Sequence, residues 1–294
     1  MSNVEFRQTH HNVEQSSQDS YNTRMKKFHQ HKPHRASNFS KPQAAKTGWE
    51  QVSDWYGGHM AENDSLLNTV VYPGVIKLLA PEKGKQYLDI ACGEGAFGRL
   101  LAKSGVHTFG FDASPSLIER AQRLAPTNTK YVMGDATRFA KLCQGIKFDG
   151  ATCLLAIQNI DPIAPVFHDA ASVLASGAPL VIVMNHPSFR IPRQSAWGWE
   201  DARQIQYRRI DMYMSPMKIP ILAHPGADRS IKTVSYHRPL STYINALGGA
   251  GFAVSALEEW TSNRVSDSGP KAKAENRARA EFPMFLALRA IKIK

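Results

Sequence analysis

The sequence is poor in cysteine, with three in 294 residues, at Cys92, Cys143 and Cys153. Their positions have none of the close spacings of a zinc or iron–sulfur site, and we expect no metal. A small odd number also argues against a disulfide-stapled secreted domain, so all three are expected to be reduced thiols.

No apolar run approaches the roughly 20 residues that cross a bilayer. The polar start of the chain lacks the apolar core of a secretory signal. We therefore expect a cytoplasmic protein without a membrane partner.

Acidic residues are scarce relative to basic ones, with 25 Asp and Glu against 36 Lys and Arg, which gives a net charge of +11. Residues 1–46 hold eight basic and three acidic residues and few apolar ones. Such a segment cannot bury enough apolar surface to offset the entropy of ordering, so it is predicted to be a disordered basic tail. A basic surface attracts polyanions or acidic small molecules, and contact of the tail with RNA stays open.

The rest of the chain, residues 47–294, has the composition of a folded domain, since 43% of the whole sequence is hydrophobic. Short apolar segments alternate with helical patterns. The expected strands are 86–91, 108–112, 131–134, 148–156 and 179–185, and the expected helices are 96–104, 114–125, 137–144 and 164–175. This alternation predicts an α/β fold with a parallel sheet and right-handed crossovers.

The most informative stretch is residues 86–101, which read QYLDIACGEGAFGRLL. A short apolar strand is followed by a glycine-rich turn and then by a helix. Glycines permit positive φ angles and let a ligand approach the backbone, and the helix directs its first N–H groups at the turn. A strand–turn–helix unit of this kind binds nucleotide-like ligands in α/β sheets.

Two families share this local pattern. Gly93, Gly95 and Gly98 spell G-x-G-x-x-G, and Asp112 closes the next strand 19 residues after Gly93, as a NAD-binding unit requires. A NAD fingerprint does not call for two further acids that this chain has. Asp89 lies four residues before the first glycine, and Asp135 follows the third strand.

The ordered series of three acids around the glycine turn resembles the class I S-adenosylmethionine (SAM) methyltransferases, over residues 85–294. The resemblance implies a Rossmann-like seven-stranded, mostly parallel sheet with an antiparallel last strand and helices on both faces. It also implies SAM as the cofactor. The positions that match the family's cofactor-binding residues are Asp89, Gly93, Gly95, Asp112, Asp135, Ala156 and Gln158.

Two segments flank or interrupt the predicted sheet. Residues 47–84 are expected to form helices before the first strand that contribute to a lid over the cofactor. Residues 186–237 are too long for a turn and are predicted to form a cap or substrate loop inserted after strand five. A helix at 241–247 and strands at 252–260 and 282–293 then complete the fold.

Candidates for the chemistry lie where strands four and five end. His186 and Asp161 are candidate general bases, which are needed only if the methyl acceptor arrives protonated. The cap is rich in arginine and aromatic residues, which suit an acidic or aromatic small molecule. The predicted acceptor-binding residues are Arg190, Arg193, Trp197, Tyr207 and Arg208.

Three functions remain open from the sequence. The first is a small-molecule methyltransferase, the second an RNA methyltransferase that uses the basic tail, and the third a non-catalytic SAM-binding protein. After strand four the chain reads QNIDP at 158–162 rather than the Asn/Asp-Pro-Pro-aromatic signature of amino-group methyltransferases that act on nucleobases. This difference argues against such targets.

Overall fold

The computed structural model describes residues 65–222 and 232–293, and the account below concerns these two ranges. The predicted tail at 1–46 and the first part of the predicted lid, residues 47–64, lie outside them. Within the described ranges, no helix is long and apolar enough to cross a membrane.

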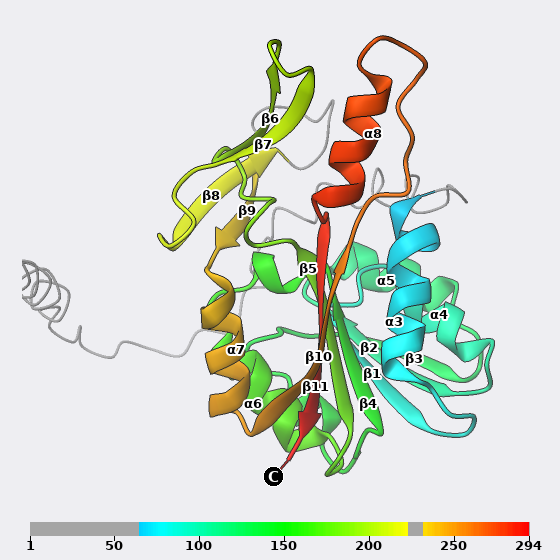
Figure 1. Ribbon diagram of the computed structural model, residues 1–294. Coiled ribbons are helices and arrows are strands. Elements are labelled where there is room, and N and C mark those ends of the chain that lie inside the picture. The colour runs from blue at the N-terminus through cyan, green and yellow to red at the C-terminus, as the bar shows by residue number, and fades with distance from the viewer. Residues whose placement is uncertain (1–64, 223–231, 294) are drawn as a thin grey trace, which may run out of the picture. The chain divides into compact units, whose positions relative to one another are not determined.

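Seven strands form one sheet, in the order β10-β11-β5-β4-β1-β2-β3 (Figure 1). Their bounds are β1 (Gln86–Ile90), β2 (His107–Asp112), β3 (Thr129–Met133), β4 (Gly150–Leu154), β5 (Pro179–Asn185), β10 (Phe252–Trp260) and β11 (Phe285–Lys292). The first five strands are parallel, and β11 lies antiparallel between β5 and β10. The predicted Rossmann-like fold is therefore confirmed. Because β10 runs parallel to β5, its end lies at the same sheet edge as the carboxyl ends of β1–β5.

Helices cover both faces of this sheet (Figure 1). They are α3 (Tyr72–Leu79) after a π-helical turn η2 (Leu67–Val71), α4 (Ala96–Ala102), α5 (Pro115–Arg123), α6 (Ala164–Val173) and α7 (Leu240–Gly249). A further helix, α8 (Ala272–Glu281), lies beyond one edge of the sheet (Figure 1). The interior strand β5 is apolar on both sides. Its Leu180, Ile182 and Met184 belong to one buried cluster, and Val181 and Val183 belong to another. This alternation explains why β5 reads as a continuous apolar run.

The predicted helix at 137–144 was wrong, because the structure has only a short 3-10 turn there, η3 (Ala140–Cys143). In this segment, aspartate side chains accept hydrogen bonds from backbone N–H groups that would bond to backbone carbonyls in a helix. Asp135 accepts hydrogen bonds from the backbone N–H and the hydroxyl of Thr137, and Asp169 accepts one from the N–H of Ala140. Aspartate side chains compete with helical bonds in this way.

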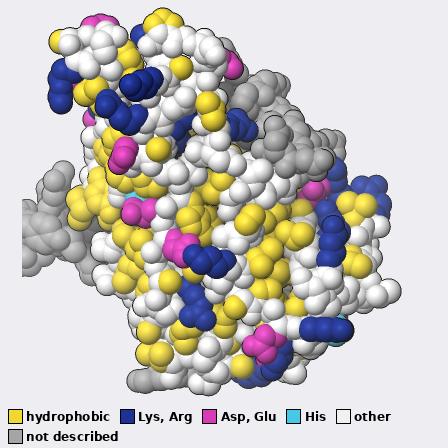
Figure 2. All heavy atoms as spheres, turned by 45° about the vertical axis from the view of Figure 1, so that its right-hand side comes forward, with side chains coloured by type: hydrophobic (Ala, Val, Ile, Leu, Met, Phe, Trp, Pro, Cys, Tyr) yellow, Lys and Arg dark blue, Asp and Glu magenta, His cyan; other side chains and the backbone are white. Residues whose placement is uncertain are grey.

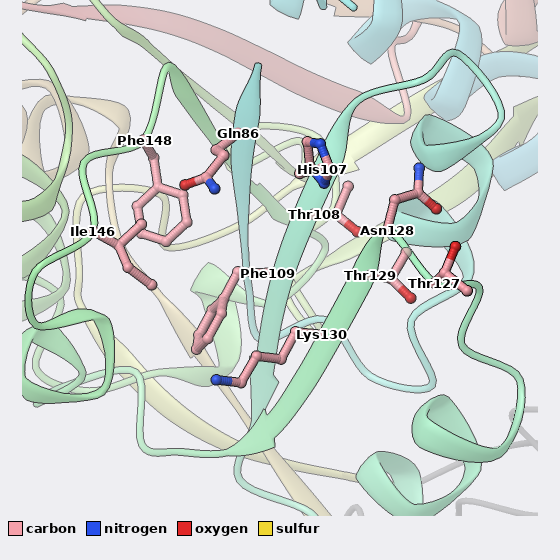
Figure 3. A pocket seen from close by; sticks show the side chains of 10 residues that line it. All are labelled: Gln86, His107, Thr108, Phe109, Thr127, Asn128, Thr129, Lys130, Ile146 and Phe148. Carbon is pink, nitrogen blue, oxygen red and sulfur yellow. The ribbon is translucent and has the colours of Figure 1, made fainter. Parts of the chain in front are cut away.

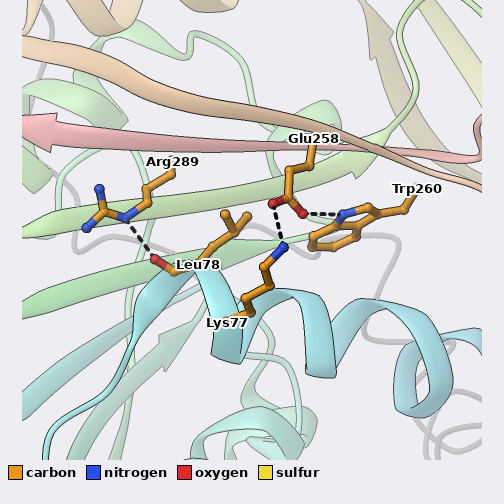
Figure 4. Close-up of polar contacts among 5 residues, drawn as sticks. All are labelled: Lys77, Leu78, Glu258, Trp260 and Arg289. Atoms are coloured by element: carbon orange, nitrogen blue, oxygen red, sulfur yellow. Dashed lines mark hydrogen bonds and ion pairs between the residues drawn. The ribbon is translucent and has the colours of Figure 1, made fainter.

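Helix α3 joins the start of the domain to its last strands (Figure 4). Lys77 and the indole N–H of Trp260 both bind the carboxylate of Glu258, and Arg289 donates to the carbonyl of Leu78. The Trp260 ring lies so close to Gly74 that a Cβ there would come within 2.4 Å of it. Glycine at position 74 therefore permits α3 to dock on β10 and β11.

Residues 186–237 contain two antiparallel hairpins that are separate from the main sheet. The first pairs β6 (Ser195–Glu200) with β7 (Ile205–Ile210), and the second pairs β8 (Met217–Leu222) with β9 (Lys232–His237). The sequence interpretation had no strands here. Figure 1 shows both hairpins and α8 beyond the edge at which β5 ends. The carboxyl ends of the parallel strands and this insertion therefore lie on the same side of the molecule.

Candidate functional site

The glycine-rich turn links β1 to α4 at the carboxyl edge of the sheet. Gly93 and Gly95 have φ angles of 56° and 75°, which glycine adopts without strain. Asp112, at the end of the neighbouring strand β2, fixes this turn: its Oδ2 accepts a hydrogen bond of 2.9 Å from the N–H of Gly93. Its Oδ1 accepts one of 2.9 Å from the N–H of Ser114, which caps α5. The predicted acid of strand two thus lies directly beside the predicted turn.

Asp89 lies beneath the same turn and is almost completely buried, with 4% of its surface exposed. The Thr152 hydroxyl, on the adjacent strand β4, donates a hydrogen bond of 2.8 Å to its Oδ1. Burial is the largest cause that raises the pKa of Asp89, and the nearby charge of Asp112 adds to it, while the Thr152 hydrogen bond lowers it; the net pKa is about 7. The two acids therefore form a pair whose negative charges repel at neutral pH.

The remaining cofactor candidates lie where β3 and β4 end. Asp135 follows β3, is held by Thr137, and pairs with Arg138 at 3.2 Å. Gln158 lies in the turn η4 (Ile157–Asn159), and Ala156 precedes it. The Gln158 side chain donates to the carbonyl of Leu155, while its buried Oε1 has no hydrogen-bond partner among the described residues.

Gly98, the third glycine of the motif, has a structural explanation that does not involve a ligand. A Cβ at Gly98 would meet the Tyr131 hydroxyl at 2.7 Å, and one at Gly95 would meet the Tyr131 ring at 2.5 Å. The same hydroxyl donates to the carbonyl of Gly95. The pattern that resembles a NAD fingerprint therefore includes a glycine that makes room for a core tyrosine.

The acids around the turn determine which ligand the edge can hold. A dinucleotide would bring its pyrophosphate, with two negative charges, to a turn lined by Asp89 and Asp112. SAM carries positive charges and ribose hydroxyls, which match carboxylate acceptors and the unpartnered Oε1 of Gln158. The residues present fit SAM better than NAD.

His186 follows β5 and is the first of the two candidate bases. Its Nδ1 accepts a hydrogen bond from the N–H of Ser188 at 3.1 Å, so the ring proton lies on Nε2. Nε2 is 2.7 Å from Oε1 of Glu259, on β10, and therefore donates to it. Burial lowers the pKa of His186, an effect that Glu259 offsets in part. The ring is thus neutral at pH 7, with both nitrogens engaged.

Asp161, the second candidate base, follows η4. Its Oδ1 accepts a hydrogen bond of 2.7 Å from Arg238, whose guanidinium also donates to the carbonyl of Ile160. Arg238 is buried and stacks against Tyr236. The pair ties the residue after β9 to the end of β4.

Three of the predicted acceptor-binding residues gather in one place. The Arg208 guanidinium lies over the ring of Trp197 at 5.0 Å and donates to the carbonyl of Phe189 and to the Ser195 hydroxyl. Arg190 is close enough that the charge of Arg208, together with burial as the larger effect, lowers the pKa of Arg190. The Arg190 side chain has no hydrogen bond or ion pair with the described residues.

Aromatic rings connect this arginine pair to His186. The Phe189 ring lies 4.7 Å from the His186 ring and 5.6 Å from Phe282, and Phe282 lies 5.6 Å from Trp197. We call Arg190, Arg208, Trp197, Phe189 and Phe282 the cap cluster. It combines two half-buried cations with a wall of aromatic rings.

The other two predicted residues lie apart from the cap cluster. Arg193 donates to the carbonyl of Pro220, in the second hairpin. Tyr207 is opposite Gly198 in the β6–β7 register, and its ring occupies the space where a Cβ of Gly198 would lie. The structure gives both residues contacts within the hairpins.

Sequence reasoning missed Glu259 and Arg238. A carboxylate pair, Glu258–Glu259, at the end of an apolar strand was a visible signal. Because side chains alternate along a strand, one of the two must point to each face. Only the structure shows that Glu258 binds Lys77 and that Glu259 binds His186.

A cavity of about 200 Å³ lies at the opposite, amino-terminal edge of the sheet (Figure 3). Its lining includes Gln86, His107 and Thr129, which lie at the starts of β1, β2 and β3. Ligands of open α/β sheets bind outside the carboxyl ends of the strands. This cavity is therefore not part of the candidate site.

Basic side chains gather on the upper part of the molecule in Figure 2, the part that holds α8 and the first hairpin in Figure 1. Helix α8 holds three basic and two acidic residues, Lys273, Arg277, Arg279, Glu275 and Glu281. Lys271, just before the helix, lies over the ring of Trp199 at 4.6 Å. The approach to the cap cluster is therefore positively charged, which favours encounter with anions.

Comparison with known proteins finds similarity to methyltransferases. Residues 88–177 match the family model described as a methyltransferase domain. A demethylmenaquinone methyltransferase of Tropheryma whipplei is 29% identical over 38% of this chain and 46% of its own length. A ubiquinone biosynthesis O-methyltransferase of Coxiella burnetii is 30% identical over 37% of this chain and 47% of its own. The chain thus spans about half the length of these relatives.

A solved structure gives wider coverage. The crystal structure of a SAM-dependent methyltransferase from Mesorhizobium loti has a TM-score of 0.60 and 25% identity with this chain, and the match covers 78% of this chain and 99% of that one. The similarity therefore extends well beyond the residues matched by the family model.

Proposed function

We propose that this chain, which carries a domain of the class I SAM-dependent methyltransferases, transfers the methyl group of SAM to a small molecule with an anionic or aromatic group. When bound, SAM supplies a methyl group on a positively charged sulfur, which makes it ready for in-line displacement. Asp112 would hold the ribose hydroxyls, and Asp135 would lie beside the adenine. Asp89, Gly93, Gly95, Ala156 and Gln158 would surround the methionine and sulfonium part.

The proposal for the acceptor rests on one observation: Arg190 is half-buried beside Arg208 and has no partner among the described residues. Burying an unpaired cation is costly, and a second cation nearby adds repulsion. An anionic group between the two guanidiniums would relieve both effects through charge-assisted hydrogen bonds. The rings of Trp197, Phe189 and Phe282 would contact the apolar part of the same molecule.

The relatives support a small-molecule acceptor. The two bacterial proteins described above are named for demethylmenaquinone and for ubiquinone biosynthesis. The proposed organisation has a basic disordered tail at 1–46 and a methyltransferase domain at 47–294. Within that domain, residues 47–84 would contribute to a lid, although their helix α3 itself docks on β10 and β11, and residues 186–237 would form the cap over the acceptor.

The test uses the purified full chain and SAM labelled in its methyl group. The small-molecule fraction and the RNA fraction of a cell extract are offered separately as acceptors. We expect label in a small, acidic or aromatic product. Label in RNA alone would support the alternative role of the basic tail, and no transfer to either fraction would contradict the proposal.

A further inference from the structure

We propose that Glu259 is the group that removes the proton from the acceptor, and that His186 is a positioning residue that holds Glu259 in place. This inference rests on the proposed methyl transfer. It reverses the sequence expectation, in which His186 itself was a candidate base.

The hydrogen bonds around His186 fix the roles. Because Nδ1 accepts from the N–H of Ser188, the only ring proton lies on Nε2 and is donated to Glu259. Neither ring nitrogen is left to accept a proton from a substrate. The His186 side chain is 4% exposed, whereas that of Glu259 is 51% exposed. Of the two partners, only the carboxylate can meet an incoming molecule.

The position of Glu259 suits this role. Strand β10 ends at the same sheet edge as β5, and the sheet order places β11 alone between them. Neighbouring strands are about 4.8 Å apart, so the backbones of β5 and β10 are roughly two strand spacings apart, and the side chains of His186 and Glu259 together bridge that gap. Phe189 of the cap cluster stacks on the same imidazole. Glu259 is therefore joined to the cap cluster through one imidazole, which contacts both.

The charged groups around Glu259 leave its carboxylate accessible. Its neighbour Glu258 points to the other face of the sheet, where it binds Lys77 and Trp260. Among the described residues, His186 is the only ion-pairing partner of Glu259. The imidazole occupies Oε1, which leaves Oε2 for the substrate.

The proposed step is balanced without any further reactant. The acceptor brings an O–H or N–H group. Its proton moves to Oε2 of Glu259, while the electron pair remains on the oxygen or nitrogen and forms the new bond to the methyl carbon. The sulfur–carbon bond breaks and its electrons stay on sulfur. Glu259 then releases the proton to water.

The test compares the wild type with Glu259→Gln and with the control Glu258→Gln. The labelled-methyl assay uses the small-molecule fraction of a cell extract, and calorimetry measures SAM binding. Positioned bases contribute about 10²–10⁴-fold, so Glu259→Gln should lower transfer at least about 100-fold at pH 7 while SAM affinity and melting temperature stay unchanged. Its residual rate should rise with pH, because hydroxide then takes the proton. Glu258→Gln should transfer at the wild-type rate.

Nitrogen NMR gives a readout that needs no turnover. In the wild type His186 should be the Nε2–H tautomer, and in Glu259→Gln its pKa should fall, because the carboxylate that raises it is gone. Wild-type transfer and an unchanged pH profile in Glu259→Gln would overturn this inference alone. Loss of SAM binding in that variant, or an Nδ1–H tautomer in the wild type, would overturn it as well. A wild type that labels nothing would instead contradict the proposed function.

Discussion

Asp112 and Gly93 are joined by a hydrogen bond of 2.9 Å, from the backbone N–H of the glycine to Oδ2 of the carboxylate. The bond couples the end of β2 to the turn after β1, so the carboxylate that we propose as the ribose ligand also shapes the turn. We expect SAM to bind the purified protein and NAD not to bind.

Replacing Asp112 by alanine should weaken SAM binding by about 1.5–3 kcal/mol for each charge-assisted hydrogen bond lost. Isothermal calorimetry measures this directly. Asp149→Ala is the matched control, because this carboxylate lies at the opposite edge, where it pairs with Lys85. Binding of NAD without SAM, or equal losses in the two variants, would contradict the assignment.

The second prediction concerns the arginine pair of the cap cluster. Arg190→Ala and Arg208→Ala should each lower methyl transfer, at a cost of about 1.5–3 kcal/mol in transition-state stabilisation, through the lost charge-assisted contact with the acceptor. SAM affinity should not change, since the proposed cofactor site lies at the ends of β1–β4. Arg203→Ala is the control, because this exposed arginine pairs, among the residues that the structure describes, only with Glu200, at 3.7 Å. The reverse pattern, weaker SAM binding with normal acceptor kinetics, would refute the placement.

The third prediction compares two glycines in helices. Gly74→Ala should destabilise the protein by about 1–3 kcal/mol, because the new methyl group must displace the Trp260 ring. Gly248→Ala, in α7, meets no atom within 4 Å and should stabilise by up to about 1 kcal/mol through helix propensity. Urea unfolding of both variants measures the change in the free energy of unfolding, which should be a decrease for Gly74→Ala and an increase for Gly248→Ala. Equal effects would show that α3 does not dock tightly on Trp260.

The sequence predicted the sheet well where burial dictates the pattern. Residues 179–185 were predicted as a strand and form β5 with the same limits, because a strand buried on both faces is a short continuous apolar run. The sequences of the two hairpins contain no comparable pattern of apolar residues that would predict a strand. Every residue of β6 is half-buried, so its sequence, SAWGWE, has no apolar face that alternates with a polar one.

The candidate site also has one part that the sequence could predict and one part that it could not. The meeting of Asp89, Gly93 and Asp112 at one sheet edge, where we propose that the cofactor binds, could be predicted because these residues lie at fixed spacings within consecutive βα units. The pair of His186 and Glu259 could not, because the residues are 73 positions apart and meet only when β10 lies next to β11. The register of antiparallel end strands depends on packing across the whole sheet. For the same reason, sequence alone could not show which predicted arginines come together.

The last prediction concerns the effect of Asp89 on stability at different pH values. The unfolded chain ionises this acid near its ordinary pKa of 3.8, and the folded protein ionises it only at about 7. Between these values the folded state holds a proton that the unfolded state has released. The ionisation of Asp89 therefore lowers the free energy of unfolding as pH rises from about 4 to 7. Above pH 7 the acid is ionised in both states, and its contribution no longer changes with pH.

Asp89→Asn removes this charge and keeps an oxygen that can accept from Thr152. Three pKa steps correspond to about 4 kcal/mol, so the variant should exceed the wild type in stability by up to that amount at pH 8. The difference should shrink as the pH falls toward 4. Urea unfolding of both proteins at pH 5 and pH 8, without SAM, measures it. A constant difference between the two pH values would mean that Asp89 ionises normally in the folded protein. The turn would then carry two full negative charges at neutral pH, and the repulsion that disfavours the pyrophosphate of NAD would be stronger than a half-protonated Asp89 allows.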